Sequence, residues 1–307
     1  MAIEDMSASS SQPVTASVRN IVDLDLDDRI TLLKGFSGCL VVLCERADGT
    51  RFVRKVAPNH SYNRRLKIQV DKQSKFVPSH QCYAVPILKS GILLTGAAYV
   101  DMDYIPGITA AEAIFRAPLS EVPNWAQLLL CFTDPRPQAA HATIKPDVFL
   151  KKIDLLEHDL ISRGYATALV RVALSRLKSR SWDGIPETPC HGDLTLENII
   201  VHNSKFYLFD FLDSFAETWY ADIAKLMQDL IAGWSFRHRL IDRNLAIRLA
   251  ALKDSLEYSL EKIDSGALDH IHALYVLALI RILPYANQLH ERDFIDDRVA
   301  SALDVIL

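Results

Sequence analysis

The chain has 307 residues, half of them apolar, and a formal net charge of -4. This length usually exceeds one hydrophobic core, so we expect one large domain or two coupled domains. The small net charge disfavours a nucleic-acid-binding protein, for which a basic patch is expected. The five cysteines are odd in number and include no CxxC pair. They therefore argue against a disulfide framework or a zinc site and favour a reducing, cytoplasmic location.

The N-terminal residues 1–20 are rich in Ser, Thr and Ala and have little apolar surface to bury. We therefore predict a mobile tail there. No apolar run approaches the roughly 20 residues of a membrane helix, and the start of the chain lacks the apolar core of a signal peptide. The sequence thus predicts no membrane segment.

Two strand-like runs, residues 30–46 and 51–57, flank a turn sequence and predict a hairpin. Gly35, Ser37 and Gly38 lie at the bend inside the first run. Small residues at a bend let backbone N–H groups approach phosphates closely, as a loop that covers a nucleotide requires. Such turns are common, and neither a Walker A motif nor a Rossmann GxGxxG is present, so the loop alone is weak evidence.

The pattern then changes from strands to helices. Lys55 lies in the second strand of the hairpin, where the strand pattern alone would suit an edge-strand lysine that faces water. A helix is predicted over 63–76, where Leu66 and Val70 are one turn apart, and a strand over 92–107 that ends at Pro-Gly. Beyond it the pattern is mainly helical, over residues 108–117, 124–132 and 148–180, the last as one long helix or two broken around Gly164.

The most informative stretch is 191–213, HGDLTLENIIVHNSKFYLFDFLD. Its β-branched and aromatic runs around a polar turn predict a hairpin. Asn198 and Asp210 are equidistant from position 204, inside that turn, so we expect them nearly opposite, with Cα atoms roughly 5 Å apart. An amide and a carboxylate at the mouth of a hairpin suit Mg²⁺. Asp193 would lie beside the metal, placed to accept a proton from an attacking hydroxyl.

These motifs carry a family resemblance. HGDLTLEN followed by FDF resembles the catalytic and metal-binding motifs of the aminoglycoside phosphotransferase and choline kinase family, small-molecule relatives of protein kinases. The HxDxxxxN pattern alone is unspecific, and the hairpin with its terminal Asp makes it more specific. The resemblance implies Asp193 as catalytic base, Asn198 as Mg²⁺ ligand, and Asp210 as the carboxylate between metal and phosphates. His191 fits the histidine that supports the loop. Gly192 replaces the arginine of phosphorylation-switched protein kinases.

The same resemblance assigns roles in the N-terminal part. It implies that Lys55 contacts the nucleotide phosphates and is held by an acid on the following helix. Asp71, sixteen residues later, is the candidate, although the family usually has Glu there. Residues 102–106 resemble the hinge, which binds adenine through backbone groups. The backbones expected to do so belong to Asp103, Tyr104 and Ile105.

The implied fold is α+β and protein-kinase-like, with two lobes. A small antiparallel-sheet N-lobe would occupy residues 21–106 and a larger, mainly helical C-lobe residues 107–307. Asp222, predicted to begin a helix, resembles the family aspartate that braces the catalytic loop, and also suits a helix cap or first-turn acid. Packing or an acceptor pocket would explain the polar and aromatic residues near it, namely Trp219, Gln228, Asp229, Trp234 and Arg237.

The predicted function is a Mg²⁺-dependent transfer of the γ-phosphate of ATP or GTP to a hydroxyl of a small molecule. The resemblance favours a sugar or surface-glycan precursor as acceptor. Two alternatives remain open, a pseudokinase or regulator that binds nucleotide without turnover and a protein kinase of bacterial type. No pattern in the sequence sets the oligomeric state.

Overall fold

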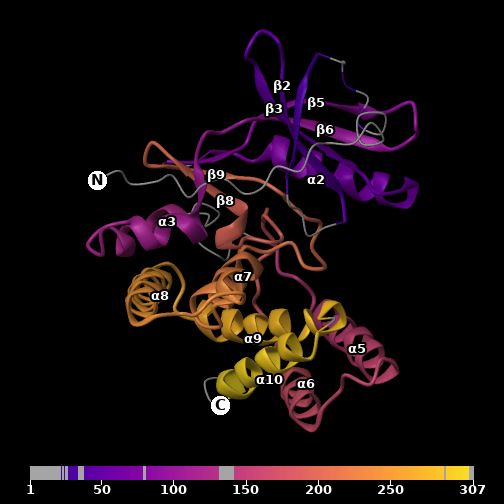
Figure 1. Cartoon of the computed structure of the whole chain (residues 1–307). Coiled ribbons are helices and arrows are strands. Elements are labelled where there is room, and N and C mark those ends of the chain that lie inside the picture. Colours follow the sequence, from indigo (N-terminus) through magenta and orange to yellow (C-terminus); the bar gives the residue numbers. More distant parts are fainter. Residues whose placement is uncertain are drawn as a thin grey trace. The chain divides into compact units, whose positions relative to one another are not determined.

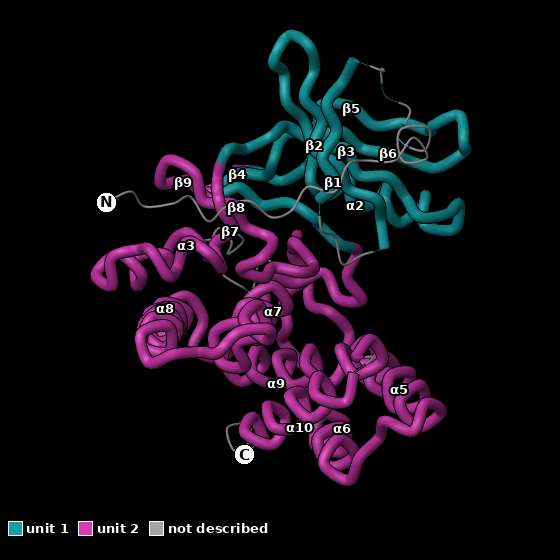
Figure 2. The backbone as a smooth tube through the Cα atoms, in the orientation of Figure 1, with its two compact units in different colours: residues 1–77, 83–106, 207–212 teal, residues 78–82, 107–206, 213–307 magenta. Residues whose placement is uncertain are grey.

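The computed structural model describes residues 22, 24, 27–33, 38–78, 81–130, 142–286 and 288–303. The chain divides into two compact units (Figure 2). Unit 1 contains residues 1–77, 83–106 and 207–212, and unit 2 contains residues 78–82, 107–206 and 213–307. The predicted tail at 1–20 and two predicted nucleotide-loop residues, Gly35 and Ser37, lie outside the described residues.

Unit 1 is built on a five-stranded antiparallel sheet with the strand order β1-β2-β3-β6-β5 (Figure 1). The strands are β1 (Arg29–Leu33), β2 (Leu40–Glu45), β3 (Arg51–Val56), β5 (Ile87–Ile92) and β6 (Ala98–Asp103). β2 and β3 form a hairpin in which Leu40 pairs with Val56, within the two predicted runs. Gly38, the described member of the small-residue loop, lies two residues before β2 and has φ +73°.

The two faces of this sheet bury different cores. One core contains Val22, Val42, Phe52 and Tyr99. The other contains Leu66, Val100 and Met102 and includes helix α2 (Asn63–Lys75), which was predicted over 63–76. Because side chains alternate along a strand, the neighbours Arg54 and Lys55 on β3 point to opposite faces, Lys55 toward α2.

The strand predicted over 92–107 is shorter in the structure. A turn precedes β6, in which Leu93 N–H donates to Ala97 O at 2.9 Å and Gly96 N–H to Leu93 O at 2.8 Å. Gly96 has φ +79°, a left-handed conformation that glycine adopts readily. The apolar residues on both sides of this glycine hid the turn, so the prediction merged the end of β5, the turn and β6.

A second sheet has the strand order β4-β9-β8-β7. Its strands are β4 (Cys82–Ala84), β7 (Ile108–Thr109), β8 (Ile199–His202) and β9 (Lys205–Leu208). β8 and β9 form the hairpin expected after the catalytic stretch. Its two-residue turn, Asn203 and Ser204, has φ +49° and +58°, as a type I′ hairpin turn requires. The centre of the hairpin lies between Asn203 and Ser204, half a residue before the midpoint predicted at 204. Asn198 and Asp210 are therefore offset by one residue from the opposite positions that were predicted for them.

Unit 2 is mainly helical. Its helices are α3 (Ala110–Arg116), α4 (Trp125–Leu129), α5 (Pro146–Ser162), α6 (Ala168–Ser179), α7 (Trp219–Leu230), α8 (Arg243–Ile263), α9 (Ala267–Ile280) and α10 (Leu289–Leu303). α9 packs against α6, α7, α8 and α10. The sequence of residues 148–180 thus forms two helices rather than one. The predicted α+β class, with an antiparallel sheet in one part and helices in the other, is confirmed.

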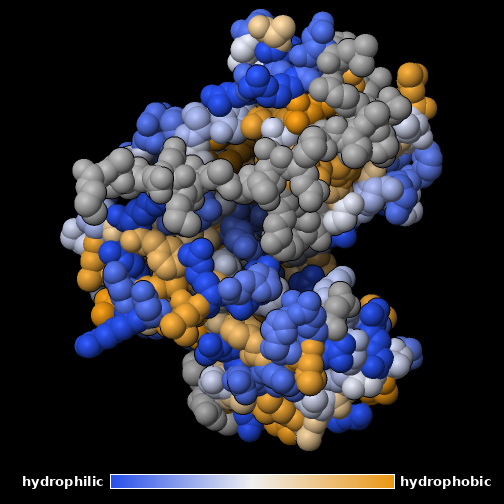
Figure 3. Space-filling view, in the orientation of Figure 1, coloured by the Kyte–Doolittle hydropathy of each residue, from blue (hydrophilic) through white to orange (hydrophobic). Residues whose placement is uncertain are grey.

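α9 is the most apolar helix. Among the described residues, the stretch Ala267–Tyr285 alone is long and apolar enough to cross a membrane, but 61% of its most apolar window is buried, as in the core helix of a globular unit. It corrects the expectation that no run approaches that length. On the face drawn in Figure 3, hydrophilic residues are interspersed with hydrophobic ones over the helices of unit 2. The apolar side chains of α9, including Leu274, Leu277 and Ile280, lie in the core.

Candidate active site

Lys55 is a buried cation in unit 1. Its side chain is 7% exposed, and its ammonium group forms an ion pair with the carboxylate of Asp210 and donates to Gln69 Oε1 at 3.1 Å. Burial lowers the pKa of the Lys55 amine, but the charge and hydrogen bond of Asp210 outweigh burial and hold the pKa above its usual value. Lys55 is therefore charged at neutral pH.

The predicted pair of Lys55 with Asp71 is absent from the contacts of the described residues. Helix α2 turns Leu66, Gln69 and Gln73 toward the sheet, at the spacing of one helical face, while Asp71 is exposed. Gln69 is the α2 residue that contacts Lys55. The prediction was wrong because it looked for an acid in α2, whereas the side chain on the correct face is a neutral amide.

Asp210 adopts an unusual backbone conformation. It has φ +60°, in the left-handed region that Asp tolerates better than most residues. Its side chain is 28% exposed, so the carboxylate remains accessible to solvent although it contacts Lys55. Backbone strain of this kind is common at functional sites. Asp210 lies two residues after the end of β9. Two residues further on, Leu212 O accepts a hydrogen bond from Lys72 Nζ at 2.7 Å.

The three predicted hinge residues follow or end β6. Asp103 is the last residue of the strand, and its N–H donates to Pro86 O at 2.9 Å. The ring of Tyr104 lies under the guanidinium of Arg51, 4.4 Å from Cζ to the ring centre. Ile105 packs against the core that includes α2. The Asp103 N–H is therefore engaged in the fold, and the backbones of Tyr104 and Ile105 are the better candidates for contacts with a base.

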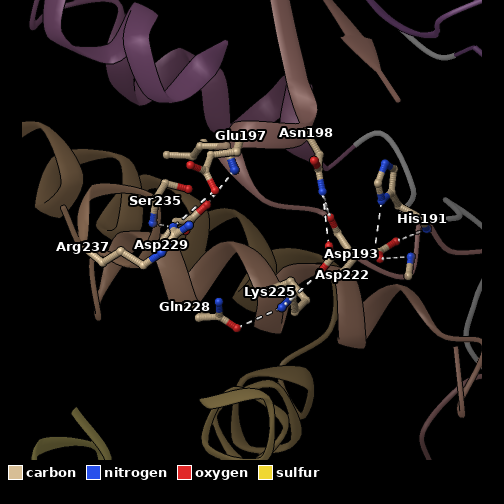
Figure 4. Close-up of polar contacts among 12 residues, drawn as sticks. His191, Asp193, Glu197, Asn198, Asp222, Lys225, Gln228, Asp229, Ser235 and Arg237 are labelled. Atoms are coloured by element: carbon tan, nitrogen blue, oxygen red, sulfur yellow. Dashed lines mark hydrogen bonds and ion pairs between the residues drawn. The ribbon is translucent and has the colours of Figure 1, made fainter. Parts of the chain in front are cut away.

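The catalytic loop of unit 2 is held by helix α7 (Figure 4). His191 N–H donates to Asp222 Oδ2 at 2.6 Å and Gly192 N–H to Asp222 Oδ1 at 2.7 Å. The predicted bracing role of Asp222 is thus confirmed, and Asp222 is also the acid predicted in the first turn, while Thr218 is the helix cap. His191 is fully buried, and its Nδ1 accepts from Asp193 N–H at 3.3 Å, which confirms that it supports the loop. Gly192 has φ +88°, which strongly disfavours any side chain there.

Asp193 lies between an amide and an ammonium group. Asn198, at the end of the short 3-10 helix Leu196–Asn198, donates from Nδ2 to Asp193 O at 2.8 Å and to its Oδ2 at 3.3 Å. On the other side, Lys225 Nζ lies 3.0 Å from Asp193 Oδ1 (Figure 4). Burial raises the pKa of the Asp193 carboxyl, but the charges of Lys225, His191 and Arg281 lower it below its usual range. Asp193 is therefore ionised at neutral pH.

A second carboxylate of α7 holds the end of the loop. Asp229 is fully buried and accepts from Leu196 N–H at 2.6 Å and Ser235 N–H at 3.0 Å. Burial raises the pKa of Asp229 to about 6, although these hydrogen bonds act in the opposite direction. Nearby, Arg237 lies over the ring of Trp234 and 3.4 Å from Glu197 Oε2. These interactions place Asp229 and Arg237 in the framework of the loop.

The residues expected to hold Mg²⁺ suit that ion chemically. The amide nitrogen of Asn198 is engaged with Asp193, so its amide oxygen is the atom left for a metal. Asp210 offers a partly exposed carboxylate. Among the described residues, no three His, Cys, Asp or Glu side chains gather in a way that could hold a metal. One carboxylate and one amide fit Mg²⁺, which usually keeps several waters and binds few protein ligands. Asp210 belongs to unit 1 and Asn198 to unit 2.

Lys225 was not identified from the sequence. It follows Asp222 by three residues and precedes Asp229 by four, so all three lie on one face of α7. That spacing was visible, but its meaning depended on knowing that this face contacts the catalytic loop. Gln228 supports Lys225 by accepting from its Nζ at 3.0 Å.

Comparison with known proteins identifies the fold. A thermostable mutant of aminoglycoside phosphotransferase APH(4)-Ia, in ternary complex with AMP-PNP and hygromycin B, has a TM-score of 0.62 at 14% identity, over 94% of this chain and 98% of that chain. A putative fructosamine-3-kinase from Thermobifida fusca has a TM-score of 0.58 at 14% identity, over 95% and 98%. Choline kinase from Cryptosporidium parvum has 0.54 at 10%, over 94% and 93%. At these identities the likeness shows the kinase-like fold alone.

The sequence itself shows the family. No curated protein sequence matches the chain. The model of the phosphotransferase enzyme family matches residues 41–257, which include the Lys55 strand, the catalytic loop and α7. This match covers more than half of the chain and confirms the predicted resemblance and the predicted class of small-molecule kinase. The chain therefore belongs to the phosphotransferase enzyme family.

Proposed function

We propose that this protein transfers the γ-phosphate of ATP or GTP, with Mg²⁺, to a hydroxyl group of a small molecule. The observation that carries the proposal is the ionised Asp193 carboxylate, fixed between Lys225 and Asn198 in a loop that α7 holds by its backbone. A charged group held so rigidly suits a reaction in which positioning and charge stabilisation supply most of the catalysis.

In the proposed reaction, Asp193 orients the acceptor hydroxyl and takes its proton. Each carboxylate oxygen has more than one acceptor site, so the contacts with Lys225 and Asn198 leave room for a hydroxyl donor. The acceptor oxygen forms a bond to the γ-phosphorus while the bond from that phosphorus to the β–γ bridging oxygen breaks. The proton goes to Asp193, and the nucleoside diphosphate leaves.

The remaining predicted residues would bind the nucleotide. Lys55 would contact the phosphates as a permanently charged donor, and Tyr104 and Ile105 would contact the base through backbone groups. Mg²⁺, held by Asn198 and Asp210, would neutralise charge on the phosphates. The structure supports this assignment through the buried ion pair of Lys55 with Asp210 and the free amide oxygen of Asn198.

The test is Asp193→Asn, assayed for nucleotide consumption with Mg²⁺ against sugars, amino alcohols and aminoglycosides. We expect acceptor-dependent turnover to fall by about 10²- to 10⁴-fold, the usual contribution of a general base, while nucleotide binding persists. Asp147→Asn, an exposed acid at the start of α5, is the matched control and should behave as wild type. Unchanged turnover in Asp193→Asn would exclude Asp193 as the base.

One observation favours the alternative of a nucleotide-binding regulator. The α2 residue that contacts Lys55 is the neutral Gln69, whereas the family resemblance predicted an acid as the partner of Lys55, at Asp71. The same assay separates the two functions. A wild-type protein that is stabilised by Mg²⁺ and nucleotide, but consumes no nucleotide with any acceptor, would be a regulator.

A further inference from the structure

Lys225 is a cation that the fold fixes beside the proposed base. Its Nζ lies 3.0 Å from Asp193 Oδ1 and donates to Gln228 Oε1 at 3.0 Å (Figure 4). An ammonium group has three N–H donors and no acceptor. These contacts use two of the donors, and the third has no hydrogen-bond partner among the described residues. A donor therefore remains available next to the carboxylate that would accept the proton.

Gln228 holds Lys225 in place at a cost to the fold. Gln228 is fully buried, so its amide oxygen supports the ammonium group from inside unit 2. Its amide nitrogen is buried as well and has no hydrogen-bond partner in the part of the chain that the structure describes. A buried donor without a partner lowers the stability of a protein. This loss keeps Lys225 in position, which points to a role for Lys225 in function.

Lys225 and Asp193 are both accessible to a substrate. Their side chains are 19% and 29% exposed, whereas that of Lys55 is 7% exposed. Both residues belong to unit 2, and their charged groups are in direct contact. A molecule that brings a hydroxyl group to the Asp193 carboxylate would therefore come within reach of the Lys225 ammonium group.

The ammonium group of Lys225 restricts the chemistry of such a molecule. The reacting hydroxyl would donate to Asp193 at about 2.7 Å, while Lys225 needs an acceptor atom. Two oxygens on adjacent carbons lie within hydrogen-bond distance of each other when they are gauche, so the neighbouring oxygen can accept from Lys225. A hydrogen atom in its place would leave the donor unpaired. An ammonium group there would bring two like charges close together.

We propose that Lys225 binds the acceptor, and that the acceptor carries an uncharged oxygen on the carbon next to the reacting hydroxyl, as sugars and polyols do. An amino alcohol, which carries an ammonium group on that carbon, is disfavoured. The inference rests on the proposed function, because it names the class of acceptor for the same reaction. Asp193 and Lys225 would bind two neighbouring oxygens of one substrate, and together they would select the hydroxyl that is phosphorylated.

The experiment compares acceptors that differ only in the group next to a hydroxyl. Glycerol, 1,3-propanediol and serinol carry a hydroxyl, a hydrogen and an ammonium group on the middle carbon. Glucose, 2-deoxyglucose and glucosamine differ in the same way at the second carbon. Turnover and thermal stabilisation are measured with Mg²⁺ and nucleotide at about pH 6.5, where the amines are charged.

The variants separate binding of the acceptor from support of Asp193. Lys225→Met removes the ammonium group, and Lys225→Gln is a second neutral variant, should Lys225→Met not fold. Lys225→Arg keeps the charge and is the conservative variant. Lys151→Met is the matched control, because it removes a lysine from an exposed site on α5.

We expect the wild type to prefer the member with the neighbouring hydroxyl. Its kcat/KM should exceed that of the deoxy member about 10- to 100-fold, the usual effect of one hydrogen bond from a charged group. The ammonium member should be consumed least. Lys225→Met should lower kcat/KM for every member, because it also removes a support of Asp193, and should reduce the preference within each set to about 2-fold or less. Lys225→Arg should recover part of the preference, and Lys151→Met should retain all of it.

Three outcomes would overturn the inference. They are a wild-type preference for the deoxy or ammonium members, an unchanged preference in the neutral variants, and no binding or consumption of any hydroxyl member. An unchanged preference would show that Lys225 only holds Asp193 or contacts the transferred phosphate, since those roles affect all acceptors equally. If choline or kanamycin is phosphorylated instead, only the acceptor class is wrong. If no acceptor is phosphorylated, the proposed function itself fails.

Discussion

Strand β3 carries two neighbouring cations, Arg54 and Lys55, which the sheet places in different environments. Both side chains are less than a tenth exposed. Arg54 donates to both oxygens of Asp101, at 2.7 and 2.8 Å, and to Val22 O at 2.7 Å. Lys55 contacts one oxygen of the partly exposed Asp210 and the neutral Gln69. Arg54 and Lys55 are thus buried to the same extent. Arg54 binds both oxygens of its carboxylate partner, whereas Lys55 binds only one oxygen of a partly exposed carboxylate.

The difference separates a structural charge from one that we propose contacts the nucleotide. The planar fork of arginine matches both oxygens of a carboxylate, and the Arg54–Asp101 pair is further covered by the rings of Phe52 and Tyr99. Nothing else is needed to satisfy these groups. The Lys55–Asp210 pair leaves acceptor and donor capacity on both partners, which a nucleotide and a metal would use. Burial is the same for both cations, so the incomplete coordination of Lys55 is the observation that supports its proposed role.

The largest expected effect distinguishes the two cations by stability. Arg54→Leu should lower the free energy of unfolding by about 3–5 kcal/mol, because it leaves Asp101 buried and unpaired. Lys55→Met should cost about 1 kcal/mol, since Asp210 retains access to water, but should abolish nucleotide-dependent turnover. Urea unfolding and the turnover assay check both expectations. Equal losses of stability in the two variants would break the contrast.

The same contrast applies to carboxylates and predicts a pH effect. Asp229 accepts from two backbone N–H groups and forms no ion pair among the described residues, and burial raises its folded-state pKa to about 6, above the usual value of an aspartate. The folded state therefore binds this proton more tightly, so its contribution to stability is complete at low pH and is lost as pH rises through about 6. We expect the free energy of unfolding of the wild type, measured in urea, to exceed that of Asp229→Asn by about 1 kcal/mol less at pH 7 than at pH 5. A difference that is constant with pH would show that Asp229 stays ionised when folded.

The smallest effects test the contacts of Lys55 on α2. Gln69→Leu removes the hydrogen bond to Lys55 and should lower stability by about 1 kcal/mol and raise the KM for nucleotide several-fold. Asp71→Asn, at an exposed site of the same helix, should change stability by less than about 0.5 kcal/mol and leave the KM unchanged. If Asp71→Asn raised the KM more than Gln69→Leu does, Asp71 would be the residue that supports Lys55, as the sequence suggested.

The sequence was most informative where local patterns determine structure. The β2–β3 and β8–β9 hairpins, helix α2 and the motif from His191 to Asn198 follow from strand runs, turns and spacing. The roles of Gln69 and Lys225 did not, because each depends on which helical face meets another element. Gln69 lies on the same face of α2 as Leu66 and Val70, so the helical period alone places it toward the sheet. The left-handed backbone of Asp210 had no sequence signal, since only the tertiary fold imposes it.

Helix α7 fixes the catalytic loop at three points, through Asp222, Lys225 and Asp229. These three anchors lie on one face of α7 because their spacing in the sequence matches the helical period. An insertion or deletion of one residue between them would rotate the later anchors by about 100° and turn them away from the loop. The length of this segment is therefore under a stricter constraint than its composition, and sequence drift in α7 should be confined to substitutions on its other faces.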